Sequence, residues 1–143
     1  MPYPHRCSLE IDGTEIHAAS ACVEMRAPRD EDGQPEIGVL ETSIAVCLDL
    51  HDRANVGFDV VSRLFELANR ATQEKIVDMA VTLWDDEDHE DVIGRFNFRG
   101  WISLWRAETP KRYTQAEDQN HELYIELQPE LDPEQLHRIQ LSN

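Results

Sequence analysis

The sequence lacks any apolar run of the roughly 20 residues that a membrane-spanning helix needs, and basic residues are scarce. Only 13 lysine and arginine residues stand against 29 aspartate and glutamate residues among 143, which gives a formal net charge of -16. Such an acidic surface is unsuited to phosphate backbones and anionic lipids, so we expect neither nucleic acid nor membrane insertion. The same charge opposes self-association, which should make any oligomer sensitive to salt. Solubility, or adaptation to salt, is the alternative reason for the acidity.

Cysteine is also scarce. Cys7, Cys22 and Cys47 are dispersed, odd in number and without Cys-x-x-Cys spacing, a pattern typical of reduced thiols rather than of a disulfide framework. The first residues contain no apolar segment of the kind found in secretory signal peptides. We therefore expect a cytoplasmic protein that does not use the general secretory route.

Motifs for catalysis are missing as well. The sequence contains no Gly-x-Ser-x-Gly elbow, no cysteine in a recognisable catalytic signature and no glycine-rich phosphate loop. Carboxylates are plentiful only because acidic residues are plentiful, and no pair stands out as an acid and a base. We predict no catalytic residues, no bound cofactor and no enzymatic activity. An enzyme of unrecognised type is the least favoured alternative.

Metal-binding patterns are equally weak. The histidine and cysteine pairs at residues 5–7 and 47–51 lack the paired spacing of structural zinc sites. The acidic segments at residues 30–33 and 85–91 lack the ligand spacing and flanking helices of a calcium-binding EF-hand. We predict solvated turns and packed thiols here, and no metal ion.

What the sequence does contain is a series of β-strand patterns. The length suits one domain over residues 1–143, and 41% hydrophobic residues suit a globular core. Apolar side chains alternate most clearly along residues 40–50. Further strands are expected at residues 8–11, 15–25, 76–84, 122–127 and 136–141, with an Asp-Gly turn closing an opening hairpin. The pattern predicts a mainly β fold.

One segment has a helical period. Between residues 56 and 71, Phe58, Val61, Phe65 and Ala68 recur at steps of three and four. This pattern predicts a single α-helix whose broad apolar stripe packs against a sheet.

A long strand is expected near residues 92–105, where Gly94 and Gly100 indicate bends or bulges. Strict alternation places Phe96, Phe98, Ile102 and Leu104 on one face, and Arg95, Asn97, Arg99, Trp101, Ser103 and Trp105 on the other. Aromatic and arginine side chains are enriched at protein interfaces, so Trp101 and Trp105 are candidate subunit contacts. The alternative is that both faces are buried, one of them under the helix.

Residues 26–36 form a highly polar stretch between two strand patterns. A tight hairpin needs only two to five residues, so the length of this loop indicates a function outside the domain core. Its candidate contact residues are Arg29, Asp30, Asp32, Gly33, Gln34 and Pro35.

The order of these segments resembles the tube protein of the bacterial type VI secretion system, the haemolysin-coregulated protein (Hcp, TssD) family, whose fold is shared with phage tail tubes. The similarity runs nearly end to end and depends on short motifs in sequence order. They are the opening strand and turn at residues 9–13, Gly33-Gln34-Pro35 in the loop, the strand that follows residues 38–39, and the Gly-aromatic strand at residues 100–105. Gln34 stands where the family has arginine.

The resemblance implies a β-barrel of two packed sheets with one helix, assembling as a hexameric ring that stacks into a hollow tube. Such a tube would have sheath, spike and effector proteins as partners and would be exported by the contractile apparatus without a signal peptide. The polar loop would then reach a neighbouring ring or subunit. The alternative from another class is a monomeric acidic β-barrel adaptor or ligand-binding module, which a closed apolar pocket would favour.

Overall fold

The computed structural model describes residues 4–36, 41–69, 72–110, 120–130 and 139–143. As predicted, the chain is mainly β-strand with one α-helix. Its elements are β1 (Cys7–Ile11), β2 (Thr14–Ala18), β3 (Ser20–Arg26), β4 (Glu41–Asp49), α1 (Phe58–Asn69), a 3-10 turn (Gln73–Lys75), β5 (Val77–Trp84), β6 (Val92–Glu108), β7 (Glu122–Pro129) and β8 (Ile139–Ser142).

Several expected segments extend into parts of the chain outside the described residues. These parts are residue 40 at the start of one strand, residues 70–71 at the end of the helix, and residues 136–138 of the last strand. The family motif at residues 38–39 also lies outside them. No helix in the described ranges is long and apolar enough to cross a membrane.

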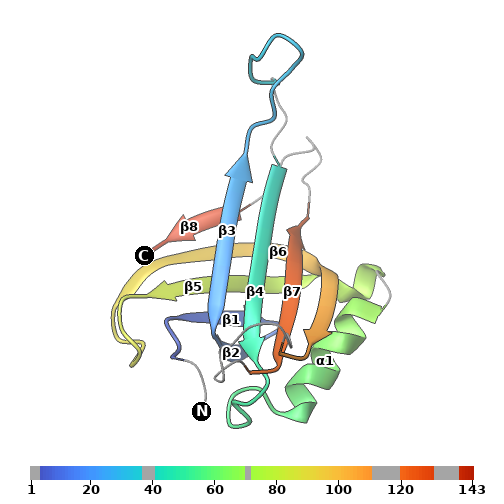
Figure 1. Cartoon of the computed structure of the whole chain (residues 1–143). Coiled ribbons are helices and arrows are strands. Elements are labelled where there is room, and N and C mark those ends of the chain that lie inside the picture. The colour runs from blue at the N-terminus through green and yellow to red at the C-terminus, as the bar shows by residue number, and fades with distance from the viewer. Residues whose placement is uncertain (1–3, 37–40, 70–71, 111–119, 131–138) are drawn as a thin grey trace.

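The described strands form one antiparallel sheet in the order β2-β1-β5-β6-β7-β4-β3, with β8 also paired to β6. The sheet folds over on itself, so that β3, β4 and β7 cross the layer made by β1, β2 and β5 (Figure 1). The long strand β6 belongs to both layers, because its first part pairs with β5 and its second part with β7. One hydrogen-bonded sheet therefore supplies both layers of the expected sandwich.

Gly100 marks the point where the two ladders of β6 meet. It pairs with Val77 of β5 on one side and with Pro129 of β7 on the other. A Cβ atom at this position would lie 2.2 Å from the carbonyl oxygen of Gln128. Only glycine lets β7 approach so closely, so the residue fixes how the second layer joins the first.

The core lies between the two layers and follows the predicted alternation. Strand β4 buries Ile44, Val46 and Leu48, and β7 opposes them with three buried side chains of its own. The fully buried apolar set includes Leu9, Ile16, Ile44, Val46, Leu48, Leu64, Val81, Leu123, Ile125 and Leu127. Burying such side chains contributes about 1.5–3 kcal/mol each.

Helix α1 packs against β6, but it buries less of its apolar surface than its sequence predicts. Leu64 and Leu67 face the core, and Asp59 lies in the first turn, where a carboxylate interacts favourably with the helix dipole. The side chain of Phe58 is 86% exposed, so its expected place in the packed stripe was wrong. The helix begins at that residue, two positions later than predicted, whereas Val60 and Val61 of the same turn pack against the core.

Candidate assembly surfaces

The polar loop extends the β3–β4 hairpin and projects beyond the strands of the sheet (Figure 1). Arg29 and Pro35 form an isolated antiparallel bridge, and the Glu36 N–H donates to the Pro28 carbonyl at 2.9 Å. Except for Pro28, residues 27–36 are exposed. The loop is thus ordered by its own backbone bonds rather than by packing on the domain.

Asp30 organises the tip of this loop. One oxygen of its carboxylate, Oδ1, accepts the backbone N–H groups of Asp32 and Gln34, each at 2.9 Å. Its carbonyl accepts the Gly33 N–H at 3.0 Å, and Gly33 has φ of +81°, the left-handed region that favours glycine. Asp30 and Gly33 therefore shape the loop, a role that composition alone did not reveal.

Among the candidate contact residues of the loop, Arg29 and Asp32 have charged side chains left for a partner. Neither makes an ion pair or a side-chain hydrogen bond to any other residue that the structure describes. By contrast, Arg26 at the end of β3 is paired with Glu24 at 2.8 Å. Glu31 and Glu36 are also exposed and have no ionic partner in the described residues, so the loop presents one positive and three negative unpaired groups on a self-supporting arm.

The two tryptophans of β6 do not share a face, which corrects the prediction from strict alternation. Opposite β7 the register shifts, so that Ile102 pairs with Leu127, Leu104 with Glu126 and Trp105 with Ile125. Ser103 is the extra residue of this bulge, and its hydroxyl donates to the Glu126 carbonyl at 3.2 Å. The bulge moves Trp105 to the core face and Leu104 to the outer face.

Trp105 lies against α1, as the alternative interpretation of this strand expected. Its ring meets Phe65 edge-on at a centroid separation of 5.3 Å and packs against the core cluster. Trp101 is half-buried on the other face, opposite Gln128. As a candidate subunit contact, Trp101 is therefore better placed than Trp105, whose aromatic surface is already used within the chain.

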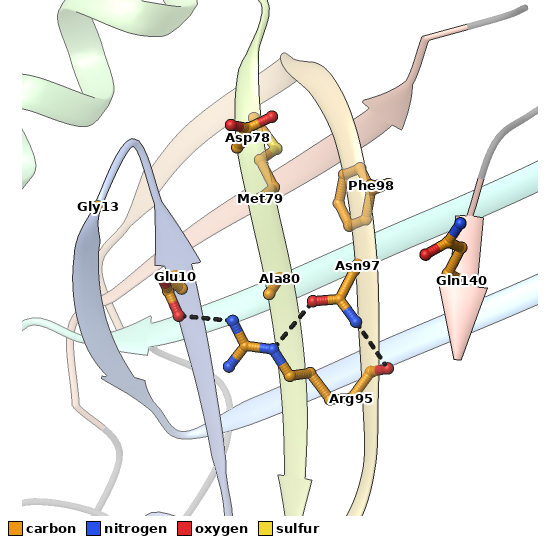
Figure 2. Close-up of a pocket in the computed structure, with 9 residues that line it drawn as sticks. All are labelled: Glu10, Gly13, Asp78, Met79, Ala80, Arg95, Asn97, Phe98 and Gln140. Atoms are coloured by element: carbon orange, nitrogen blue, oxygen red, sulfur yellow. Dashed lines mark hydrogen bonds and ion pairs between the residues drawn. The ribbon is translucent and has the colours of Figure 1, made fainter. Parts of the chain in front are cut away.

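The arginines expected to make the outer face basic have acidic partners within the chain. Arg95 bonds Glu10 at 2.7 Å and Asn97 at 2.9 Å, as Figure 2 shows. Arg99 approaches Asp78 at 3.6 Å and Glu130 at 3.7 Å. These pairs reduce the positive charge that a neighbouring subunit would meet.

A pocket of about 350 Å³ opens on this outer face, beside Arg95, Asn97, Ala80 and Gln140 (Figure 2). Within it Arg95 bonds both Glu10 and Asn97, and Asn97 also donates to the Ser142 hydroxyl at 3.1 Å. It is not the closed apolar cavity that a ligand-binding module would be expected to show.

The sequence matches no family model and no curated protein, yet several solved structures share the fold. A crystal structure of an Hcp protein superposes with a TM-score of 0.59 at 11% identity, covering 96% of this chain and 98% of the other. Hcp1 from Flavobacterium johnsoniae gives 0.56 at 12% identity, with 86% and 89% covered. A chain of the sheath-tube complex of an extracellular contractile injection system gives 0.58 at 14% identity, with 99% and 91% covered.

The fold is thus that of the phage-tail-like tube proteins. Within that class it is an Hcp-like tube fold, as the order of the sequence motifs predicted.

Proposed function

We propose that this chain is a structural subunit of a contractile secretion or injection machine, assembling into hexameric rings that stack into a hollow tube. The observation that carries the proposal is the tube-protein fold over almost the whole chain, matched on nearly the full length of an Hcp structure. The subunit would make the tube by contact alone, without covalent chemistry. Sheath, spike and effector proteins are its proposed partners, and export through the machine is its proposed route out of the cytoplasm.

The loop supports a role in stacking. It projects from the domain, is held by its own hydrogen bonds and keeps Arg29 and Asp32 without ionic partners in the described chain. A rigid arm loses little conformational entropy when it docks. The contact made by one such loop is weak, but the same contact repeated around a ring makes stacking stronger.

The first experiment measures the size of the purified protein by light scattering and electron microscopy at about 0.05 M and about 0.5 M NaCl, because screening lengths differ several-fold between them. The charge of -16 per subunit repels neighbours, so rings and tubes should increase with salt. A protein that stays monomeric under all conditions contradicts the tube function.

The second experiment tests the loop through the charge reversals Asp32→Lys and Arg29→Glu. Reversing Asp30 is unsuitable because its carboxylate holds the loop together. Glu74→Lys, in the exposed 3-10 turn after α1, makes the same charge change as Asp32→Lys elsewhere and serves as control. We expect the loop variants to shorten or abolish stacked tubes while Glu74→Lys does not. Unchanged stacking would remove the loop from the interface and leave the tube function standing.

A further inference from the structure

Histidine side chains from separate segments meet at one edge of the sheet. His17 lies on the edge strand β2, and His89 lies in the turn between β5 and β6. Their ring centroids are 4.3 Å apart, and His5 approaches His17 at 5.6 Å. His5 Nε2 is 2.6 Å from the Asp52 carboxylate, so this third ring already has an acidic neighbour.

The orientation of His89 is fixed by its surroundings. Its backbone adopts φ of +57°, and its ring stacks on Trp84 with an interplanar angle of 4°. Its Nε2 lies 3.2 Å from the His5 carbonyl oxygen, and because a carbonyl can only accept, Nε2 must carry the proton. In the neutral ring Nδ1 then holds a lone pair, and that atom is buried without a hydrogen-bond partner in the described structure.

Such an arrangement is the usual one for a metal ligand. A histidine that binds a metal through one nitrogen generally donates its other N–H to a carbonyl or carboxylate, which fixes the ring. A buried nitrogen that accepts no hydrogen bond is otherwise unfavourable. His89 is therefore already oriented as a metal ligand would be.

Glu15 completes the group. It lies two residues before His17 on β2, so both side chains point to the same side of the strand, and its carboxylate is 3.9 Å from His17 Nε2. Ligand atoms of Glu15, His17 and His89 all lie within 4.8 Å of one another. Ligands of a tetrahedral zinc ion are about 3.3 Å apart at ordinary bond lengths, so small rotations of the exposed Glu15 and the half-buried His17 bring these atoms into range.

We propose that Glu15, His17 and His89 bind a divalent transition-metal ion of the zinc class. Two imidazole nitrogens and one carboxylate oxygen suit zinc, and they leave a fourth position for water or for a donor from outside the chain. The bound ion joins the edge strand β2 to the β5–β6 turn, two segments separated by β1 in the sheet. This inference is independent of the proposed tube function.

The test is calorimetric titration of the purified protein with ZnCl2 after treatment with a chelator, with MgCl2 as a comparison ion. We expect one zinc ion per chain, little binding of magnesium, and an unfolding temperature raised by several degrees in excess zinc. His17→Gln and Glu15→Gln should each weaken zinc binding by more than about tenfold. Both residues are partly exposed, so these variants should fold normally, as circular dichroism can verify.

His51→Gln is the matched control. His51 belongs to a second histidine pair, stacked on His121 with their ring nitrogens 2.9 Å apart. We expect this variant to bind zinc like the unmodified protein. Failure to bind zinc, undiminished binding in both His17→Gln and Glu15→Gln, or loss confined to His51→Gln would each overturn the proposal.

Discussion

At the scale of single residues, two positions determine backbone geometry on which whole elements depend. Asp30 accepts the backbone donors that close the projecting loop, and Gly100 leaves room for β7 at the junction of the layers. Neither residue contributes buried apolar area. Their contribution is to permit a backbone arrangement, so their substitution should change shape as well as stability.

Gly100→Ala should lower the free energy of unfolding by about 1–3 kcal/mol, because the new methyl group meets the backbone of β7 rather than a side chain that can move. Urea denaturation followed by tryptophan fluorescence measures this. Gly94→Ala is the control, since a Cβ there would meet only the flexible end of Leu141, at 3.1 Å. Equal stability of the two variants would show that β7 yields easily at this point.

At the scale of elements, the sequence located most strands but not their breaks and irregularities. Residues 15–25, expected as one strand, form β2 and β3, which lie at opposite ends of the strand order. Alternation located β4 and β7 because both bury one face in the core, which imposes a strict period of two. The bulge in β6 breaks that period at Ser103, and no glycine or proline marks it. Gly94 borders a second irregularity, as expected, because the register against β5 shifts between its partner Leu83 and Trp84, whereas Gly100 lies outside both shifts.

The candidate surfaces were predicted in outline only. The polar composition of residues 26–36 indicated a projecting loop, while the bonds made by Asp30 depend on backbone geometry that composition does not encode. The group of Glu15, His17 and His89 was missed because its members come from segments far apart in the chain. The pair Glu15 and His17, on one side of a strand, was its only local signal.

The bulge predicts unequal roles for the two tryptophans. Trp105→Ala should cost about 2–4 kcal/mol of unfolding free energy because it removes a ring packed on Phe65 and the core. Trp101→Ala should cost less than about 1 kcal/mol of unfolding free energy in the isolated chain. Trp105→Phe should recover most of the loss, since the buried indole N–H has no hydrogen-bond partner in the described residues. Thermal or urea unfolding compares the three, and a larger loss for Trp101→Ala would contradict the observed register.

At the scale of the whole molecule, the thiols link stability to pH. Burial raises the pKa of Cys7 to about 11, and burial followed by the nearby Glu122 raises the pKa of Cys47 to about 12. The Cys7 thiol also donates to the Ala18 carbonyl at 3.4 Å. In the unfolded chain these thiols lose their protons near pH 8.5. Above that pH the unfolded state binds fewer protons than the folded state, so stability must fall as pH rises.

We therefore expect the free energy of unfolding to be insensitive to these groups below about pH 8 and to decline between about pH 9 and 11, by up to roughly 1.4 kcal/mol per pH unit for each thiol. Urea unfolding at intervals of pH measures the slope. The double variant Cys7→Ala, Cys47→Ala should reduce this loss of unfolding free energy at alkaline pH. Cys22→Ala, which removes an exposed thiol, should leave the loss unchanged. If the unmodified protein, the double variant and Cys22→Ala lose unfolding free energy equally as pH rises, groups other than Cys7 and Cys47 cause the loss.

Strand β6 couples the unfolding of the two layers. Because its amides and carbonyls bond β5 along one part and β7 along the other, neither layer can separate from the molecule while β6 stays in place. Its central amide protons should therefore exchange with solvent only when the entire domain opens, and they should be among the slowest in the chain. A domain joined in this way should unfold its two layers together rather than one at a time.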